Sequence, residues 1–288
     1  MKIAVCVKQI PDPTTVKFNI VTGQLDNVRY IMDPVDEVAL SEAIRQRDKN
    51  GGEVVAISLG PPDTEEVLRT CLKMGADEAI HLCDESFNDL DISSTAIVIA
   101  RLLSKDKYDI VLCGKESTDE GNGFLGAGIA EELNLPLVTS TTRIDIFTDT
   151  NSALVRRRVK GGDREVVETP LPAVFTVDSI LSSPVYPRLR TIIAGLKKSI
   201  TRLDAGTPGI DLGSIEPAMS SLGISQPKPR LKKTAAMDSS LSAQERMKLL
   251  MSGGVQQKKS STVEKSPKEA AAEIIQFLID NGILTKEQ

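Results

Sequence analysis

The chain has 288 residues, of which 40% are hydrophobic and 26% are charged, and this ordinary globular balance excludes collagen, coiled coil and wholesale disorder. Lysine and arginine number 35 against 40 aspartates and glutamates, so the formal net charge is −5 and binding to nucleic acid through phosphate charge is not expected. Aromatic residues make up 3% and tryptophan is absent, which argues against a stacking platform for single strands.

The sequence also limits targeting and metal chemistry. No apolar run reaches the roughly 18 residues of a membrane span. The apolar run at the N-terminus is short and ends at Pro11, so it predicts a strand rather than a signal peptide, and we expect a cytoplasmic protein. The single histidine, His81, and four cysteines without a CxxC pair favour buried core residues over a metal site or a catalytic base.

The N-terminal half of the chain alternates between continuous apolar runs and helical patterns. Each apolar run is typical of a strand buried on both faces of a parallel sheet. The predicted strands are Ile3–Val7, Val54–Leu59, Glu78–Leu82 and Asp109–Cys113. Helices are predicted at residues 34–49, 63–74, 91–104 and 122–134. This alternation indicates βαβ units, and so an α/β fold with a doubly wound, mostly parallel sheet.

After Pro136 the pattern changes to shorter strands. Strands are predicted at residues 137–147, 153–160, 164–169 and 173–177. Gly161, Gly162 and Asp163 form a hairpin turn, so the sheet gains a small antiparallel hairpin addition. Residues 183–200 predict a proline-containing loop that runs into a short basic helix.

Beyond about residue 204 glycine, proline and low-complexity stretches dominate, and they cannot bury enough apolar surface to offset the entropy of ordering. Short helices are predicted at residues 241–250 and 267–281, the second with an apolar stripe. We therefore divide the chain into an α/β domain, residues 1–204, and an extended C-terminal arm, residues 205–288. The terminal helix of this arm needs a surface to bind, such as a partner subunit.

A ligand is expected where the strand order reverses at the carboxyl ends of the strands. If the first four strands lie in the order 3-2-1-4, this crevice opens between strands 1 and 4. The loops there are residues 7–12 and 114–128. The second loop is rich in glycine just where a helix should start, so backbone N–H groups can approach a phosphate.

Residues 121–126 formally match GxGxxG, but the match is weak evidence for a dehydrogenase-type dinucleotide site. The motif follows the fourth strand, and no acidic ribose partner stands about 20 residues further on. A mononucleotide or adenosine-phosphate site is favoured, and glycines that merely ease helix packing are the simpler alternative. Asp33 and Pro34 by themselves make an ordinary helix start.

Seven ordered strings in the chain resemble the β subunit of electron transfer flavoprotein. They are VCVKQIPD (5–12), MDPVDEVALSEA (32–43), SLGPP (58–62), LRTCLKMGADEA (68–79), CGKESTDEGNG (113–123), LPAVFTV (171–177) and SPVYPRLRTIIAGLKKSI (183–200). The resemblance covers residues 1–204 and the terminal helix, and little of residues 205–266.

This resemblance implies a fold like that of the adenine-nucleotide alpha-hydrolases. It also implies a heterodimer with an electron transfer flavoprotein α subunit, with an FAD bound in the α subunit or at the subunit interface. The β subunit of such proteins holds a structural AMP or, in electron-bifurcating members, a second FAD. Electrons arrive from acyl-CoA or similar dehydrogenases and leave to a membrane quinone reductase or another acceptor. The chain would then be an electron carrier with no catalytic residue and no metal of its own.

The family's functional positions map onto residues of this chain. Nucleotide contacts are implied for Cys6, Val7, Lys8, Asp33, Pro34, Val35, Asp36, Leu59, Gly60, Gly114, Asp119, Glu120, Gly121, Asn122, Gly123, Phe124, Leu125 and Gly126. Partner docking is implied for Tyr186, Leu189 and Ile193, with Leu189 in the place of the docking leucine.

The chain departs from the family at two places in the site. Asp33 stands where the family usually has Asn, and its carboxylate is expected to accept a hydrogen bond from the adenine or ribose rather than face a phosphate. Gly123, Phe124 and Leu125 replace side chains that would bind phosphate, so backbone N–H groups must do so. We expect AMP, with FAD as the alternative.

Two rival functions come from other classes. An ATP-activating nucleotide-alpha-hydrolase enzyme would need an SGGxDS loop after the first strand, and Lys8–Pro11 is not one. A stand-alone adenine-nucleotide-binding module would need neither residues 140–200 nor the long tail.

Overall fold

The structure is a computed structural model, and it describes residues 1–20, 22–26, 28–88, 90–207, 215, 217–219, 242–244, 247 and 265–284. The chain divides into two compact units, Met1–Gln226 and Pro227–Gln288, and each is treated by itself. The sequence-based boundary after residue 204 stays a prediction.

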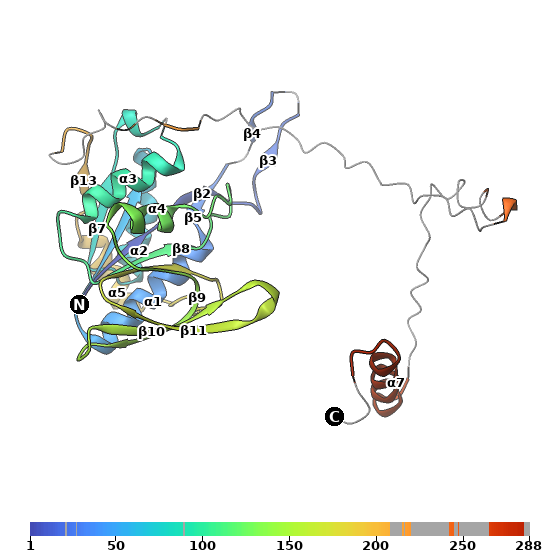
Figure 1. The fold of residues 1–288 in the computed structure, drawn as a ribbon. Coiled ribbons are helices and arrows are strands. Elements are labelled where there is room, and N and C mark those ends of the chain that lie inside the picture. Colours follow the sequence, from blue (N-terminus) through green and yellow to red (C-terminus); the bar gives the residue numbers. More distant parts are fainter. Residues whose placement is uncertain are drawn as a thin grey trace. The chain divides into compact units, whose positions relative to one another are not determined.

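The first unit is built on a nine-stranded sheet (Figure 1). In spatial order its strands are β11 (Arg164–Pro170), β10 (Ser152–Arg158), β9 (Leu137–Phe147), β12 (Ala173–Val177), β8 (Ile110–Gly114), β1 (Lys2–Cys6), β6 (Glu53–Leu59), β7 (Glu78–Leu82) and β13 (Thr201–Leu203). Only β10 runs antiparallel to its neighbours. The order β7-β6-β1-β8 is the one assumed for the first four strands, and it places the switch point between β1 and β8.

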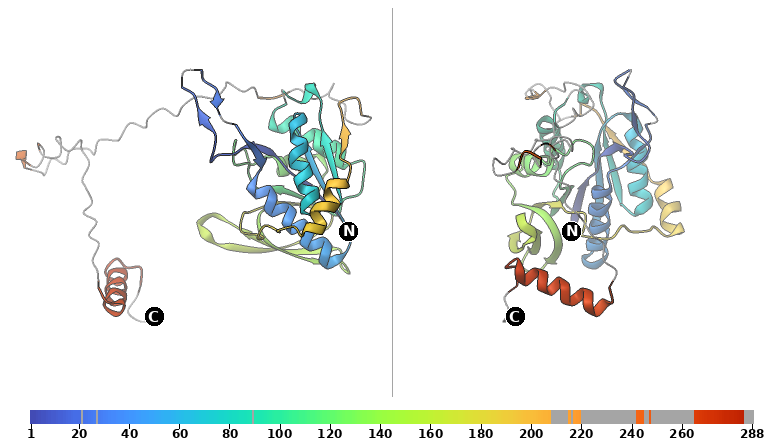
Figure 2. Two further views of the ribbon diagram at one scale, coloured as in Figure 1. Left: turned by 180° about the vertical axis from the view of Figure 1, so that it is seen from behind. Right: turned by 90° about the vertical axis from the view of Figure 1, so that its right-hand side faces the viewer.

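Two hydrophobic layers cover the faces of this sheet, which is why its central strands are apolar throughout (Figure 2). On one face lie α1 (Pro34–Asn50) and α2 (Glu65–Met74), with α5 (Leu189–Lys197) packed against α2. On the other face lie α3 (Ile92–Leu103) and α4 (Leu125–Glu132).

The helix ends follow the sequence signals. Asp33 caps α1 by accepting a hydrogen bond from the Val35 N–H at 3.0 Å, and Pro34 occupies its first turn. Gly75, with φ +124°, ends α2 in a conformation that favours glycine. Asp91 caps α3 by accepting from the Ser94 N–H at 2.8 Å.

The predicted antiparallel addition is confirmed as β9–β10–β11. The turn between β10 and β11 contains the short 3-10 helix η3 (Lys160–Gly162), where Gly161 and Gly162 have φ of +89° and +95°. These glycines turn the chain so that β11 forms the end strand of the sheet.

Several short elements were not predicted from the sequence. They are β2 (Gln9–Pro11), which pairs with β5 (Tyr30–Met32), β3 (Lys17–Phe18), which pairs with β4 (Leu25–Asp26), the 3-10 helices η1 (Pro62–Thr64) and η2 (Glu85–Phe87), and β13. The helix predicted at 122–134 begins only at Leu125, because the residues before it form a loop over the crevice.

The second unit contains α7 (Pro267–Asp280), which confirms the predicted terminal helix. A capping box between Ser266 and Glu269 fixes its start. Its apolar residues Ile274 and Phe277 are 60% and 62% exposed. The helix predicted at 241–250 falls largely outside the described residues. Among the helices of the described ranges, none is long and apolar enough to cross a membrane.

Candidate functional site

The carboxyl ends of β1 and β8 enclose a narrow cavity of about 50 Å³. Its lining comes from the β1 loop, the start of α1, the start of α3 and the glycine-rich segment after β8. The lining residues are Lys8, Asp36, Ile92, Gly114, Lys115, Glu116, Ser117, Asn122, Gly123, Phe124 and Leu125. Seven of the predicted nucleotide contacts therefore meet at this cavity.

Asp36 joins the two loops that border the crevice. Its carboxylate accepts hydrogen bonds from the Lys8 N–H at 2.8 Å and from the Gly114 N–H at 3.1 Å. A Cβ at position 114 would collide with this carboxylate, so glycine is required there. Asp36 thus positions the end of β8 against the β1 loop.

The electrostatic environment of Asp36 is unusual for a carboxylate. Burial away from water raises the pKa of Asp36 to about 8, and the nearby negative charge of Asp33 contributes in the same direction. The two N–H donors, Lys8 and Gly114, oppose this rise by stabilising the charged form. Near neutral pH the side chain therefore exists in both protonation states.

The Asp33 carboxylate forms its hydrogen bonds within the protein. Its carboxylate, 1% exposed, accepts hydrogen bonds from the Val35 N–H, from the Thr118 N–H at 2.6 Å and from the Thr118 hydroxyl at 3.1 Å. These bonds hold the glycine-rich segment onto the start of α1. They use the oxygens that the sequence analysis assigned to adenine or ribose, so that ligand contact stays a prediction.

The Lys8 ammonium group lies at the mouth of the crevice. It pairs with Asp119 at 2.9 Å and with Glu120 at 3.2 Å. Burial works to raise the pKa of Asp119, but hydrogen bonds from Lys8, Ser117 and the Glu120 N–H, together with the charge of Lys8, outweigh it and the pKa is lowered. Lys8 and Lys115 are the two lysines in the lining of the cavity.

The glycine-rich segment ends in an open helix terminus. Gly121 and Gly123 have φ of +65° and +63°, where side chains with a Cβ are strained. A Cβ at Gly126 would collide with Thr176, so this glycine lets α4 approach β12. No side chain caps α4, and its first backbone N–H groups stay available to an anion.

The remaining predicted residues lie around this cavity rather than in its lining. Leu59 and Gly60 end β6 at the same sheet edge, and the Gly60 N–H donates to the Leu82 carbonyl at 3.1 Å. Ser58 donates to the Val7 carbonyl at 2.7 Å, which ties β6 to the β1 loop. His81 is buried with its Nε2 3.1 Å from the Gly60 carbonyl oxygen, in agreement with a core histidine.

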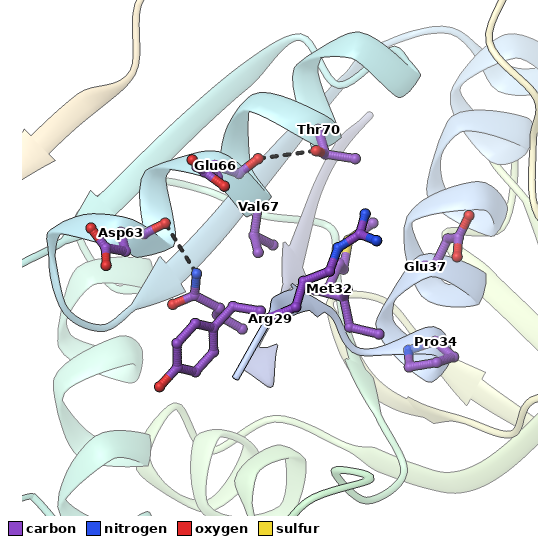
Figure 3. Close-up of a pocket in the computed structure, with 11 residues that line it drawn as sticks. Arg29, Met32, Pro34, Glu37, Asp63, Glu66, Val67 and Thr70 are labelled. Carbon is purple, nitrogen blue, oxygen red and sulfur yellow. Dashed lines mark hydrogen bonds between the residues drawn. The ribbon is translucent and has the colours of Figure 1, made fainter. Parts of the chain in front are cut away.

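A larger pocket of about 670 Å³ lies beside the crevice and was missed in the sequence (Figure 3). Its walls come from β2, β5, η1 and the starts of α1 and α2. The lining residues are Gln9, Arg29, Tyr30, Ile31, Met32, Pro34, Glu37, Asp63, Glu66, Val67 and Thr70. Gln9 directly follows Lys8, so the two cavities share the β1 loop. The only sequence signal was the Gln-Ile-Pro-Asp string, which does not reveal the pairing of β2 with β5.

The predicted docking residues are exposed. Tyr186 is 93%, Leu189 72% and Ile193 47% accessible. Leu189 and Ile193 lie on α5, and Tyr186 lies in the loop before it. The helix is held tightly on α2: a Cβ at Gly195 would collide with the Leu72 carbonyl. Arg69 adds a hydrogen bond to the Lys198 carbonyl at 2.5 Å.

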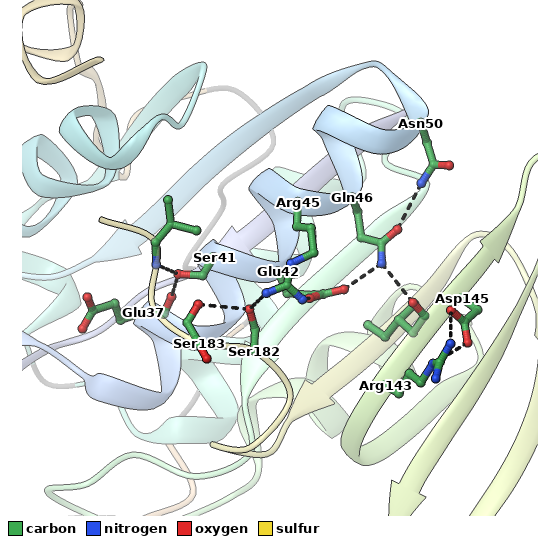
Figure 4. A network of polar contacts seen from close by, with 12 residues as sticks. Glu37, Ser41, Glu42, Arg45, Gln46, Asn50, Arg143, Asp145, Ser182 and Ser183 are labelled. Carbon is green, nitrogen blue, oxygen red and sulfur yellow. Dashed lines mark hydrogen bonds and ion pairs between the residues drawn. The ribbon is translucent and has the colours of Figure 1, made fainter. Parts of the chain in front are cut away.

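A polar network connects α1 to the strands and loops behind it (Figure 4). The Gln46 amide donates to Glu42 at 2.7 Å and to the Ile144 carbonyl at 2.9 Å. Burial raises the pKa of Glu42, while Gln46 and Arg45 favour its charged form. The network fixes α1 against β9.

The same helix anchors the segment before the docking residues. Arg45 hydrogen-bonds the Ser182 hydroxyl, and the Val185 N–H donates to the Ser41 hydroxyl at 3.0 Å. One helix therefore begins at the crevice and holds the base of the exposed loop.

Comparisons with known proteins identify the family of the chain. A family model described as "Electron transfer flavoprotein domain" matches residues 23–208. The chain is 38% identical over 214 residues to "Electron transfer flavoprotein subunit beta" of Thermoanaerobacterium thermosaccharolyticum, covering 73% of this chain and 81% of that protein. It is 37% identical over 205 residues to "Caffeyl-CoA reductase-Etf complex subunit CarD" of Acetobacterium woodii, covering 70% and 77%. It is 32% identical over 251 residues to "Protein FixA" of Azotobacter vinelandii, covering 83% and 89%.

Proposed function

The chain belongs to the electron transfer flavoprotein family, on the β-subunit side, and from this membership we propose that it is the nucleotide-holding half of a heterodimer. Its partner, the α subunit, carries an FAD that accepts and passes on electrons. This chain binds a nucleotide, supports the α subunit and presents a docking loop to an acyl-CoA-type dehydrogenase. Electrons leave the complex to a quinone-linked reductase or another acceptor.

The crevice between β1 and β8 is the observation that carries this proposal. It combines an uncapped helix N-terminus, two glycines at positive φ and the ammonium group of Lys8. Backbone N–H groups and a cation are what a phosphate needs, because both offset its charge. We propose that the phosphate of AMP binds there, with the adenosine directed toward Leu59 and Gly60.

Binding would change the partners of Lys8. Nucleotide pockets usually measure about 300–1,000 Å³, and the cavity of about 50 Å³ is smaller. Lys8 would therefore exchange Asp119 and Glu120 for the phosphate as the glycine-rich segment moves outward. AMP has no redox chemistry, so its role here would be structural: it would fix the crevice loops and α1.

A second FAD in this subunit is the alternative, and the pocket of Figure 3 favours it. Its volume of about 670 Å³ lies next to the crevice, on the same β1 loop. The apolar side chains of Met32 and Val67 and the polar side chains of Gln9 and Arg29 could hold a planar ring. With both cavities filled, the complex would be of the electron-bifurcating type.

Release of the bound nucleotides tests the proposal. The heterodimer is purified through a tag on this chain, denatured, and its nucleotides are separated and quantified. The proposal expects one FAD and one AMP per heterodimer. Two FAD and no AMP per heterodimer would instead show the alternative, a second FAD in this subunit. A colourless chain without a partner and without any adenine nucleotide would refute both.

A further inference from the structure

The cavity that we assign to the phosphate has a buried carboxylate in its wall. Asp36 lines this cavity together with Lys8, Gly123 and Leu125. It is 7% exposed, and its oxygens accept hydrogen bonds from the Lys8 and Gly114 N–H groups. The proposed function therefore sets a carboxylate beside a phosphate, and two negative charges that share a buried site repel each other strongly.

The groups around Asp36 offset little of this repulsion. The titratable and charged groups that face it are Lys8 from the β1 loop, Lys115, Glu116, Asp119 and Glu120 from the segment after β8, Asp33 and Glu37 from the start of α1, Cys71 from α2 and Cys113 from β8. Burial raises the pKa of both thiols, so they carry no charge near neutral pH. Among these described groups the acids outnumber the two lysines, and a phosphate adds further negative charge.

Asp36 is the carboxylate to which a proton is most readily added. Asp33 accepts hydrogen bonds from three donors, which favour its charged form. The side chains of Asp119 and Glu120 are 23% and 57% exposed, so water solvates them. Asp36 is buried, and burial together with the charge of Asp33 raises its pKa to about 8 already without a ligand.

We propose that Asp36 takes up one proton when the nucleotide phosphate enters this cavity, and that its carboxyl O–H then donates a hydrogen bond to a phosphate oxygen. The proposal rests on the proposed function, because it requires a phosphate at this place. The proton comes from the surrounding solution and turns the carboxylate into a neutral carboxylic acid. One negative charge is thereby removed from the wall of the site, and a repulsive contact becomes an attractive one.

Proton uptake makes the affinity for the nucleotide depend on pH. Above pH 8 most empty sites have lost the proton that the bound form holds, so binding must take it back from solution. The dissociation constant therefore rises with pH, by up to about tenfold per pH unit. The phosphate of AMP does not contribute, because its second pKa of about 6 leaves it fully ionised in this range.

Equilibrium dialysis of the purified heterodimer against radiolabelled AMP between pH 7 and 9.5 tests the proposal. In the wild-type protein the dissociation constant should rise on the order of tenfold between pH 7.5 and 9.5. Asp36→Asn places a neutral carboxamide in the wall at every pH, so its dissociation constant should stay nearly constant. Asp48→Asn is the control: it removes a carboxylate from the same helix, 64% exposed, and should follow the wild-type curve.

Asp33→Asn supplies a second test that does not depend on the assembly of the Asp36→Asn complex. The substitution removes the negative charge that helps to raise the pKa of Asp36, and asparagine can also begin a helix. The affinity for AMP should therefore start to fall at a lower pH than in the wild-type protein.

The outcomes separate this proposal from the proposed function. AMP binding whose pH dependence is flat in the wild-type protein, or is the same in Asp36→Asn and Asp33→Asn as in the wild type, would overturn the proton uptake and leave the nucleotide site in place. Absence of AMP binding at every pH would instead contradict the proposed function itself.

Discussion

Asp36 is a buried carboxylate that bonds two backbone N–H groups, and its protonation is linked to folding. The folded protein raises its pKa from 3.8 to about 8. Between these values the folded state holds a proton that the unfolded state has released. The contribution of Asp36 to stability is therefore largest at low pH and falls as pH rises toward 8.

We expect Asp36→Asn to remove this pH dependence. The thermal midpoint of the heterodimer should fall less between pH 5.5 and 8.5 in the variant than in the wild-type protein. The difference between the unfolding free energies of the variant and the wild-type protein should change by on the order of 1 kcal/mol per pH unit in that interval. Identical pH profiles for the two proteins would mean that Asp36 ionises normally.

Gly123 allows the backbone path of the phosphate-binding segment. Its φ is +63°, and an added Cβ would lie 3.4 Å from the Lys115 carbonyl oxygen. Gly123→Val should therefore reduce the nucleotide content of the purified complex severalfold, because the branched side chain strains and crowds the loop. Gly161→Val is the matched control: its φ is +89°, but it has open space around it and lies in the β10–β11 turn. Full occupancy in Gly123→Val would contradict this role.

Some features of single residues could be predicted from the sequence, and contacts between distant residues could not. The glycines at 121 and 123 were recognisable because positive φ and helix starts favour glycine. The contact between Asp33 and Thr118 was not, because 85 positions separate the residues and only the completed sheet brings them together. For the same reason the hydrogen bonds of Asp33 to the protein were not foreseen, and its contact with a ligand stays a prediction.

At the scale of elements, α5 is a rigid carrier of exposed apolar side chains. Leu189 is 72% accessible, so its truncation should leave stability almost unchanged. Leu189→Ala should slow reduction of the complex by a purified acyl-CoA dehydrogenase about tenfold, since a central apolar anchor contributes much of a small interface. Leu196→Ala, 57% exposed on the same helix, is the control and should have a smaller effect. Equal rates for Leu189→Ala and wild type, with flavin absorbance retained, would remove Leu189 as the docking residue.

The elements themselves were largely predictable. Four apolar runs and their helices predicted the α/β core, because buried parallel strands leave a strong sequence pattern. The strand order was an assumption, since apolar runs do not show which strands are neighbours. The short strands β2 and β5 were not predictable, since each has three residues and gains its stability only from the other. The pocket of Figure 3 depends on that pair and was therefore missed.

At the scale of the whole molecule, α7 is a helix with an exposed apolar face. Ile274, Ile275 and Phe277 are each at least 51% accessible. Such a helix gains stability by binding its apolar face to another surface. The family's heterodimer suggests that this surface belongs to the α subunit.

We expect the double variant I274S/F277S to weaken association of the two subunits. In pull-down titrations its dissociation constant should rise by about tenfold or more, because two buried apolar side chains would be lost. Gln276→Ser, on the same helix, is the polar control, since its side chain bonds Asp280 within the helix. An unchanged dissociation constant in I274S/F277S would show that α7 is dispensable for the heterodimer.

The central claim is that the crevice between β1 and β8 receives the phosphate of an adenine nucleotide. A crystal structure of the native heterodimer tests this most directly, because it locates the phosphate. The account predicts a phosphate at the N–H groups of Leu125 and Gly126, with Lys8 turned toward it and away from Asp119. A nucleotide phosphate bound elsewhere, with Lys8 still paired to Asp119, would contradict it.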